Sequence, residues 1–442
     1  MNYEEAVRYI LDIPFFSQTV ERQKSGNENL KFIMEELDSP HKKVKSIHIA
    51  GTNGKGSTAN FIKCILEERG YKVGIFTSPH LVDIRERIVT DEMISEEDFL
   101  SCFLLVKKAE EKIVEKGKNH ISFFEFLFAM AAVYFENKKV DYVIYETGLG
   151  GRLDATNLLS PVITVITSIG LDHTKYLGNT IKDIAGEKAG IIKADTPVVY
   201  NTGSDEADQV ISKVAKSYNA EAINVAKTDY IINDLRYKSI DFSLSNSYYN
   251  YEHILINTSA LYQLDNAATA IVTCNRLFKL IGISNISEEE CNRAFAHFLW
   301  AGRMDFIYPN VCIDGAHNEA AIKRITESIN TGFTDKKKYL LFAVAEDKDY
   351  KPMIRLLCDE LKPVEIYITK INSKRAISAE YIAELFKLHL DYECKIKSND
   401  DIKCIFDEAC REVIGHEDRI LLCTGSLYLA GEIKQIIMEA QR

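Results

Sequence analysis

The stretch VKSIHIAGTNGKGSTANFIKCILEERG, residues 44–70, decides the fold of the larger part of the chain. Residues 44–50 alternate as a strand, and apolar residues between Phe61 and Leu66 recur at helical spacing. Gly70 is expected to end that helix. The next residues, 71–78 (YKVGIFTS), alternate as a second strand. Strand, helix and strand in this order predict a βαβ unit and a parallel sheet.

The loop between that first strand and the helix, GTNGKGS at residues 51–57, has the composition of a phosphate-binding loop. Backbone N–H groups and the positive end of a helix can cradle phosphate oxygens there. A plain glycine-rich turn is the alternative, and Gly56, inserted between Lys55 and Ser57, departs from the standard P-loop pattern. Three glycines around a lysine, followed by hydroxyls, favour the phosphate site, with these nucleotide contacts: Gly54, Lys55, Gly56, Ser57 and Thr58.

A second alternation of strands and helices follows the segment LWAGRMDF, residues 299–306. Its strands are expected at residues 311–315, 338–345, 365–370 and 419–426. The chain of 442 residues therefore divides into a P-loop domain with a mostly parallel sheet, residues 1–297, and a smaller α/β domain, residues 298–442. Between residues 222 and 259 the pattern becomes tyrosine-rich and strand-like, and it predicts an antiparallel extension of the parallel sheet.

Charge and composition exclude several classes of protein. A net charge of -11 argues against a nucleic-acid partner, because such proteins concentrate Lys and Arg. The sequence contains no stretch of about 18 apolar residues, so no membrane span is expected. The N-terminus carries acids where a signal sequence would carry basic residues and an apolar run, so no signal sequence is expected. The ten cysteines form no CxxC pair and no zinc spacing, so we expect reduced core residues in a cytoplasmic protein.

Six motifs resemble those of the folylpolyglutamate synthase and dihydrofolate synthase family, of the bifunctional bacterial type, which is related to the Mur ligases. In order they are HIAGTNGKGS (48–57), TSPHL (77–81), ETGLGGRLDATN (146–157), TSIGLDHTKYLG (167–178), GEKAGIIK (186–193) and DGAHN (314–318). The resemblance implies a P-loop ATPase domain, a Rossmann-like second domain and an active site between them. It further implies an ADP-forming, Mg²⁺-dependent ligase of folate metabolism that adds L-glutamate to tetrahydrofolates and dihydropteroate through an acyl phosphate.

Metal ligands follow partly from position and partly from the resemblance. Glu146 ends the apolar strand VDYVIYE, where a carboxylate faces the ligand crevice of an α/β sheet, although a plain surface acid is the alternative. His173 and Ser78 match metal ligands of the family, although taken alone His173 would be a loop histidine and Ser78 a turn serine. Ser57 would offer a hydroxyl to the metal. Lys188 matches a lysine that the family carries as a carbamate, which would hold a second Mg²⁺. A plain lysine pairing a phosphate remains the alternative, and Lys55 and Lys188 are the expected catalytic lysines.

Further nucleotide contacts in the family fall here on Asn266, Arg303 and Asp314. The last of these ends a strand, where Rossmann-like folds place an acid that holds a ribose. Two of the three lie at or beyond the linker, so contact with ATP would require the domains to close. His317 is expected to contact phosphate or glutamate, and capping of a helix is its alternative.

Two motifs resemble the pterin-binding segments of bifunctional members. Phe124 can stack on a flat pterin, and the turn at Asp154 can bond its edge, although a core residue and a turn former are the alternatives. The early loop at residues 26–28 departs from the more apolar form of the family. The expected pterin contacts are Ser122, Phe123, Phe124, Glu125, Leu153, Asp154 and Ala155.

Two other functions remain as alternatives. A Mur ligase would act on a UDP-linked peptide, but only 50 residues precede Gly51, too few for the domain that binds the UDP-sugar. A nucleotide switch without catalysis has little need of Glu146, His173 and Lys188 together. We expect a monomer.

Overall fold

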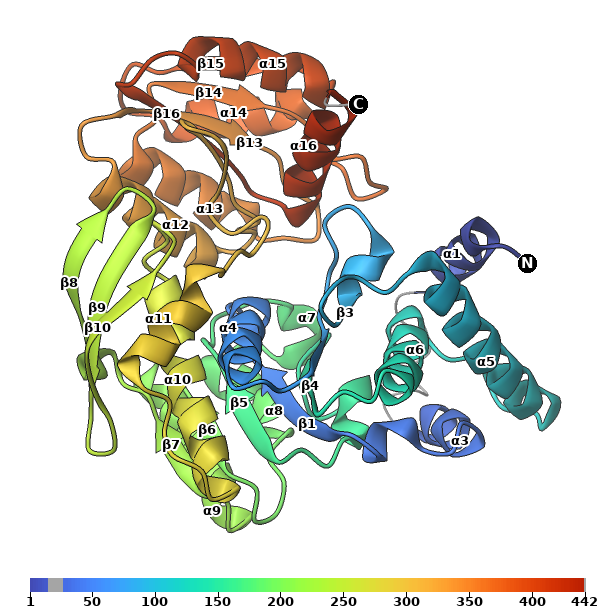
Figure 1. Cartoon of the computed structure of the whole chain (residues 1–442). Helices are drawn as coiled ribbons and strands as arrows, with labels where there is room; N and C mark the ends of the chain where they lie inside the picture. Colours follow the sequence, from blue (N-terminus) through green and yellow to red (C-terminus); the bar gives the residue numbers. More distant parts are fainter. Residues whose placement is uncertain (15–26, 441–442) are drawn as a thin grey trace. The chain divides into compact units, whose positions relative to one another are not determined.

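A computed structural model describes residues 1–14 and 27–440 (Figure 1). Contacts divide the chain into two compact units. The first comprises Met1–Ile231, Leu244–Ile254 and Asp265–Phe298; the second comprises Ile232–Ser243, Leu255–Leu264 and Leu299–Arg442. Two short segments that precede the expected boundary at residue 297 thus group with the second unit.

The first unit is built on a seven-stranded sheet in the order β3-β2-β4-β1-β5-β6-β7. All neighbouring strands are parallel except β2 and β3, which are antiparallel. The predicted fold class, a mostly parallel α/β sheet, is therefore confirmed. The strands are β1 (Lys45–Ala50), β2 (Val73–Phe76), β3 (Ile88–Val89), β4 (Tyr142–Glu146), β5 (Ile163–Ile166), β6 (Val198–Tyr200) and β7 (Ala222–Asn224).

Two of the helices of this unit illustrate how their ends are fixed. Helix α4 follows the phosphate loop and ends before Gly70, whose φ of +80° suits a residue without a side chain. Ser95 caps α5, since its hydroxyl accepts from the N–H of Asp98. The helices are α1 (Tyr3–Asp12), α3 (Glu28–Glu36), α4 (Lys55–Glu68), α5 (Glu96–Glu115), α6 (Phe123–Asn137), α7 (Thr174–Leu177), α8 (Ile181–Ala189), α9 (Asp205–Ser217), α10 (Gln263–Leu280) and α11 (Glu288–Ala296), with short turns η1 (Pro40–Lys42), η2 (Ile84–Arg87), η3 (Ala155–Leu158) and η4 (Lys227–Asp229).

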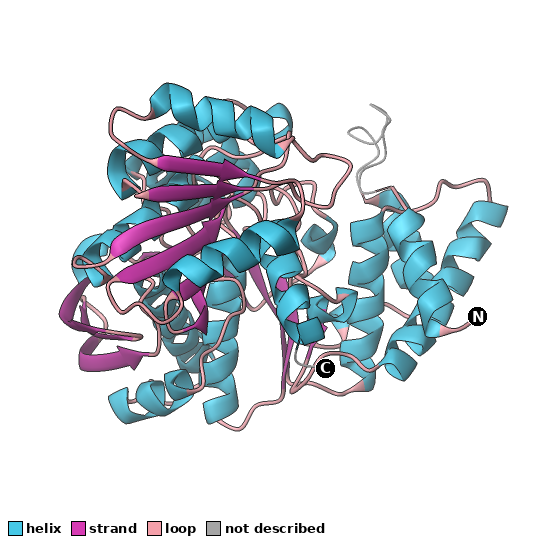
Figure 2. Ribbon diagram, turned by 90° about the horizontal axis from the view of Figure 1, so that it is seen from above, coloured by secondary structure: helices cyan, strands magenta, loops and turns pink. Residues whose placement is uncertain are grey.

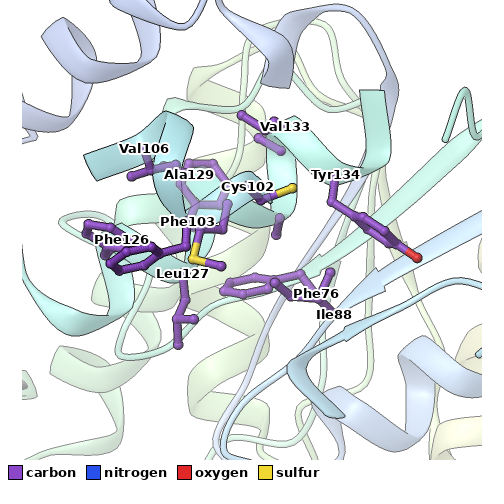
Figure 3. Packing of buried hydrophobic residues seen from close by; sticks show 14 of the residues in the cluster. Phe76, Ile88, Cys102, Phe103, Val106, Phe126, Leu127, Ala129, Val133 and Tyr134 are labelled. Carbon is purple, nitrogen blue, oxygen red and sulfur yellow. The ribbon is translucent and has the colours of Figure 1, made fainter. Parts of the chain in front are cut away.

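One hydrophobic core is centred on α6, which is apolar nearly all round. Phe126 packs against Phe103 of α5 with ring centroids 5.5 Å apart. On the sheet side, Phe128 lies edge-on to Tyr145, with centroids 5.4 Å apart (Figure 3 shows part of this cluster). Burial of α6 on several sides fixes the position of its N-terminus, where one of the two segments expected to bind pterin lies.

Residues 222–224 of the tyrosine-rich segment form the parallel edge strand β7, but the rest of the segment does not join this sheet, so the predicted antiparallel extension is wrong. Strands β8 (Tyr230–Arg236), β9 (Ser239–Ser245) and β10 (Asn250–Ile256) form a separate sheet in the order β10-β9-β8. Along β9, Ile240, Phe242 and Leu244 are buried while the residues between them are partly exposed. Such alternation suits a sheet with one covered face, whereas a strand joined to the doubly covered sheet would be buried on both.

The second unit contains a six-stranded sheet in the order β11-β12-β16-β13-β14-β15, with β11 antiparallel and the rest parallel. Helices cover both faces (Figure 2). Leu340 and Phe342 of β13 belong to one core cluster and Leu341 to the other, as the alternation of a strand requires. The elements are β11 (Asp305–Tyr308), β12 (Val311–Ile313), α12 (Glu319–Gly332), β13 (Lys337–Phe342), α13 (Tyr350–Leu356), η5 (Leu357–Leu361), β14 (Glu365–Ile368), α14 (Ala379–His389), β15 (Lys395–Ser398), α15 (Ile402–Val413), β16 (Arg419–Thr424) and α16 (Leu427–Ala440).

None of the helices in residues 1–14 and 27–440 is long and apolar enough to span a bilayer. The second α/β alternation predicted from the sequence is confirmed by this sheet.

Candidate active site

The phosphate loop connects β1 to α4, as the sequence predicts. Gly54 occupies the N-cap with φ of +89°, and a Cβ there would lie 2.3 Å from Oδ1 of Asn266. Thr58, in the first turn of α4, donates its hydroxyl proton to the same oxygen at 3.3 Å. These two contacts place Asn266, which comes from α10 and is 6% exposed, against the loop that is expected to bind the nucleotide.

Lys55 and Glu146 meet at the carboxyl ends of neighbouring strands. Residue pairing places Ile49 of β1 beside Glu146 of β4. The Lys55 ammonium lies 3.6 Å from the Glu146 carboxylate and donates to the carbonyl oxygens of Gly51 and Thr52. An ammonium and a carboxylate at the mouth of a phosphate loop are the groups needed to hold a phosphate and its counter-cation.

Ser78 also reaches this edge of the sheet. Its backbone N–H donates to Oε2 of Glu146 at 3.2 Å. The carboxylate, only 4% exposed, is thereby oriented from two sides, by Lys55 and by the backbone of the segment after β2. Glu146 and Ser78, two of the expected metal ligands, are thus brought together through the backbone of Ser78.

Lys188 is the second lysine at the loop. Its side chain comes from α8, is buried, and donates to the Gly51 carbonyl oxygen at 2.7 Å. Burial, with a smaller contribution from the positive charge of Lys55, lowers the pKa of Lys188 to about 7. The lowered pKa favours the unprotonated amine, which is a nucleophile, more than in an ordinary lysine.

His173 lies at the N-terminus of α7, in a left-handed conformation with φ of +50°. Its Nε2 is 3.9 Å from Oδ1 of Asp172, and its side chain is 40% exposed. The negative charge of Asp172 acts on Lys188 and opposes the lowering of its pKa, so the two side chains are electrostatically linked. Asp172 was not singled out from the sequence; an acid directly before the expected ligand in LDHTKYLG was the available signal.

Within residues 1–14 and 27–440, no group of three His, Cys, Asp or Glu side chains is arranged to hold a metal. A metal at the phosphate loop would therefore depend on a mixed set of ligands. Hydroxyl and carboxylate oxygens, which Ser57 and Glu146 can supply, suit Mg²⁺, which also keeps several waters and binds substrate phosphates.

The first of the two segments expected to bind pterin, residues 122–125, serves largely to cap α6. Ser122 and Glu125 form a capping box, in which the Glu125 carboxylate accepts from the Ser122 N–H at 2.7 Å and from its hydroxyl at 2.6 Å. Phe123 is buried in the core. Phe124 differs, because its half-buried ring lies 2.9 Å from the position of a Cβ on Gly148. Of the four residues, Phe124 is the one whose ring borders the loop after β4.

The second motif forms a tight loop around Asp154. The carboxylate is buried and accepts from the N–H groups of Leu149 and Thr156 at 2.9 and 3.0 Å. Leu153 is 48% exposed, whereas Ala155 is buried. In this structure the Asp154 carboxylate is used to shape the loop.

A cavity of 420 Å³ opens beside this loop. Asn27 lines it and donates through Nδ2 to the carbonyl oxygen of Asp154 at 2.7 Å. Of the early-loop residues, Gly26 lies outside the described residues, and Glu28 begins α3. The cavity is lined by Asn27, Lys31, Arg152, Leu153, Asn157, Leu158, Leu159, Ser160 and Lys193.

The three assigned residues of the second unit lie close together. Asp314 directly follows β12, is buried, and accepts from the Tyr262 hydroxyl at 2.6 Å and the Met304 N–H at 2.8 Å. Burial raises its pKa. Arg303 lies near Gly315, since a Cβ there would be 2.7 Å from its Nη1. His317 does not cap α12, because Asn318 holds that position.

Comparisons with known proteins identify relatives of both α/β parts of the chain. Residues 49–274 match the family model of the Mur ligase middle domain, and residues 308–436 match that of the dihydrofolate synthetase C-terminal domain. The chain is 36% identical to the dihydrofolate synthase/folylpolyglutamate synthase of Bacillus subtilis, over 93% of this chain and 95% of that protein.

Solved structures show the same likeness. The folylpolyglutamate synthase of Thermotoga maritima superposes with a TM-score of 0.82 at 28% identity, covering 99% of this chain and 97% of that one. FolC of E. coli, solved in complex with DHPP and ADP, superposes with a TM-score of 0.84 at 26% identity, covering 100% and 99%.

Proposed function

Because the chain belongs to the dihydrofolate synthase/folylpolyglutamate synthase family of ATP-dependent ligases, we propose that it joins L-glutamate both to dihydropteroate and to tetrahydrofolates through an acyl phosphate. The observation that supports this most is the convergence of Lys55, Lys188 and Glu146 on the loop that begins at Gly51. The alternatives of a Mur ligase or a nucleotide switch lose support, because the relatives named above are folate ligases.

In the first step, an oxygen of the substrate carboxylate bonds to the γ-phosphorus of ATP, the bond to the β–γ bridging oxygen breaks, and ADP leaves. Negative charge grows on the transferred group. The Lys55 ammonium, beside Glu146, is the fixed cation proposed to stabilise it, together with N–H groups at the start of α4.

In the second step, the glutamate amine attacks the acyl carbon, loses a proton, and expels phosphate. We assign His317 to contact with phosphate or glutamate in this step. Its Nδ1 lies 2.8 Å from the Gly315 carbonyl oxygen, which fixes the ring, and Asn318 relieves it of a capping role. Asn266, Arg303 and Asp314 are proposed as further ATP contacts.

Ser57, Ser78 and Glu146 are the proposed ligands of one Mg²⁺, and His173 with Lys188 of a second. When bound, Mg²⁺ supplies positive charge that neutralises the phosphate oxygens. The residues fit such an ion, because the buried Glu146 carboxylate sits at the end of β4 beside the phosphate loop.

A carbamate on Lys188 is proposed to complete the second site. The unprotonated amine would attack the carbon of CO₂ and release one proton, and the product is an anion. The lowered pKa of about 7 and the buried position of Lys188 support this, because an ordinary lysine is almost wholly protonated at neutral pH.

For the pterin, we propose stacking on Phe124 and contacts with the loop at Leu153, Asp154 and Ala155. The half-buried Phe124 ring beside Gly148 supports this. Ser122, Phe123 and Glu125 then act by holding the start of α6 in place.

The test is to supply ATP, Mg²⁺ and L-glutamate with either dihydropteroate or tetrahydrofolate, and to follow ADP release and product mass. We expect release with both substrates and a mass gain of one glutamyl residue. Turnover with tetrahydrofolate alone would reduce the function to polyglutamylation. No substrate-dependent ADP release would contradict the proposal.

A further inference from the structure

His48 is a buried histidine that the proposed chemistry does not use. It lies in β1, three residues before the phosphate loop, and is 0% exposed. Its Nε2 is 2.8 Å from the hydroxyl oxygen of Thr156. The hydroxyl in turn donates its proton to Oδ1 of Asp154 at 2.5 Å. A chain of hydrogen bonds thus runs from β1 to the loop assigned to the pterin.

The direction of these bonds follows from the number of protons. A threonine hydroxyl has one proton, and here it is given to the Asp154 carboxylate, so the hydroxyl oxygen accepts from His48. His48 therefore carries its proton on Nε2. Its Nδ1 is buried without a hydrogen-bond partner in the described structure, which suits a ring that is neutral. Burial lowers the pKa of this ring to about 3, in agreement with that state.

The hydrogen bonds from His48 and Thr156 hold the Asp154 carboxylate in position. Besides the Thr156 hydroxyl, it accepts from the N–H groups of Leu149 and Thr156, so it closes the loop from residue 149 to residue 156. The exposed Leu153 lies within that closed segment. Rotation of the Thr156 hydroxyl would remove one of these bonds, and the His48 N–H prevents it by occupying the oxygen from the other side.

We propose that His48, acting through Thr156, is a positioning residue that fixes the loop of residues 149–156 relative to the strand that carries the phosphate loop. This rests on the proposed function, in which that loop holds the pterin while the phosphate loop holds ATP. This relay, the hydrogen bonds that join His48, Thr156 and Asp154, would thereby set the position of the substrate carboxylate relative to the γ-phosphate. Loss of the relay would weaken binding of the pterin substrate and leave ATP binding intact.

The test compares variants that remove a hydrogen bond with variants that keep it. Thr156→Val and His48→Leu remove a polar group at similar volume, whereas Thr156→Ser and His48→Gln retain a hydroxyl and an N–H. We expect the first pair to raise KM for dihydropteroate by about tenfold, because the loop assigned to the pterin is no longer held in place, with KM for ATP changed less than about twofold. The second pair is expected to stay within about threefold of the unsubstituted chain.

Two further measurements separate positioning from a general loss of structure. The double variant His48→Leu/Thr156→Val is expected to be no worse than either single variant, because both break one relay. Amide hydrogen exchange at Leu149 and Thr156 is expected to accelerate in both single variants, with the Thr58 amide in α4 unchanged. Additive effects, equal changes in both KM values, or unchanged exchange at Leu149 would overturn the proposal. The exchange measurement needs no turnover, whereas an inactive unsubstituted chain would remove only the proposed function.

Discussion

The side-chain nitrogen of Lys188 lies 2.7 Å from the carbonyl oxygen of Gly51, the first residue of the phosphate loop. Lys55 donates to the same oxygen at 3.1 Å. Two lysines therefore converge on one backbone carbonyl, and the buried one has its pKa lowered to about 7. The arrangement keeps a reactive amine beside the place where phosphates are expected to bind.

A carbamate on Lys188 can be tested directly. With ¹³C-labelled bicarbonate, we expect a carbamate carbon resonance in the unsubstituted chain and its loss in Lys188→Ala. That variant is expected to lose at least about 100-fold in kcat, since the proposed ligand of the second Mg²⁺ is removed. Lys182→Ala, on the exposed side of the same helix, is the control and should match the unsubstituted chain. A bare amine together with a full rate in Lys188→Ala would exclude the carbamate.

Substitution of Glu146 tests the metal site. We expect Glu146→Ala to lower kcat by at least about 100-fold while the protein stays folded, because no neighbouring group replaces the charge of the ion. The concentration of Mg²⁺ needed for half-maximal rate should rise in Glu146→Gln. Glu97→Gln in α5, which is exposed, serves as a control. Activity of Glu146→Ala within tenfold of the unsubstituted chain would contradict the assignment of Glu146 as a metal ligand.

Substitution of two glycines that both have positive φ distinguishes backbone strain from a steric clash. Gly54→Ala combines φ of +89° with a Cβ that would lie 2.3 Å from Asn266, whereas Gly282→Ala has φ of +75° with nothing within 4 Å. Both should lose about 1–2 kcal/mol of stability from the left-handed conformation. Gly54→Ala alone is expected to raise KM for ATP by about tenfold or more. Equal KM values for ATP in the two variants would show that the loop tolerates a side chain at Gly54.

Acid should destabilise the protein through His48. Its folded pKa of about 3 lies below the ordinary value of 6.5, so between these values the unfolded chain binds more protons. Unfolding free energy therefore falls as pH drops through this window, by about 2 kcal/mol at pH 5 relative to pH 8 from this residue. In urea unfolding, the free energy of unfolding of His48→Gln should fall by about 2 kcal/mol less between pH 8 and pH 5 than that of the unsubstituted chain. His416→Gln, at an exposed position, should leave the slope unchanged.

Much of the frame could be predicted from the sequence because it depends on short-range patterns. The βαβ unit around residues 44–78, the end of α4 before Gly70 and the second α/β alternation all follow from periodicity and capping. The capping box of Ser122 and Glu125 had its own signature, a serine followed three residues later by glutamate. The same residues also carry the resemblance to a pterin-binding segment, so the sequence alone supports both roles.

Other features depend on contacts between distant residues. The separate sheet of β8, β9 and β10 could not be distinguished from an edge of the large sheet, because strand pairing is not visible in one strand's pattern. The bond from His48 to Thr156 spans 108 positions and has no local signal. Asp172 could have been noticed beside His173, but its effect on Lys188 appears only once α8 is in place.

The grouping of residues 232–243 and 255–264 with the second unit constrains the order in which the chain can fold. Ala260 belongs to the core formed by α12, α13 and β13, and Tyr262 packs against that core and bonds Asp314. Tyr237 packs edge-on against Phe333, with ring centroids 6.0 Å apart. A growing polypeptide makes these segments before any strand of the six-stranded sheet exists. These segments therefore cannot pack into their core until about 140 further residues, from Leu299 to the end of the chain, have been synthesised. A fragment beginning at Leu299 would lack the core residues that these segments contribute.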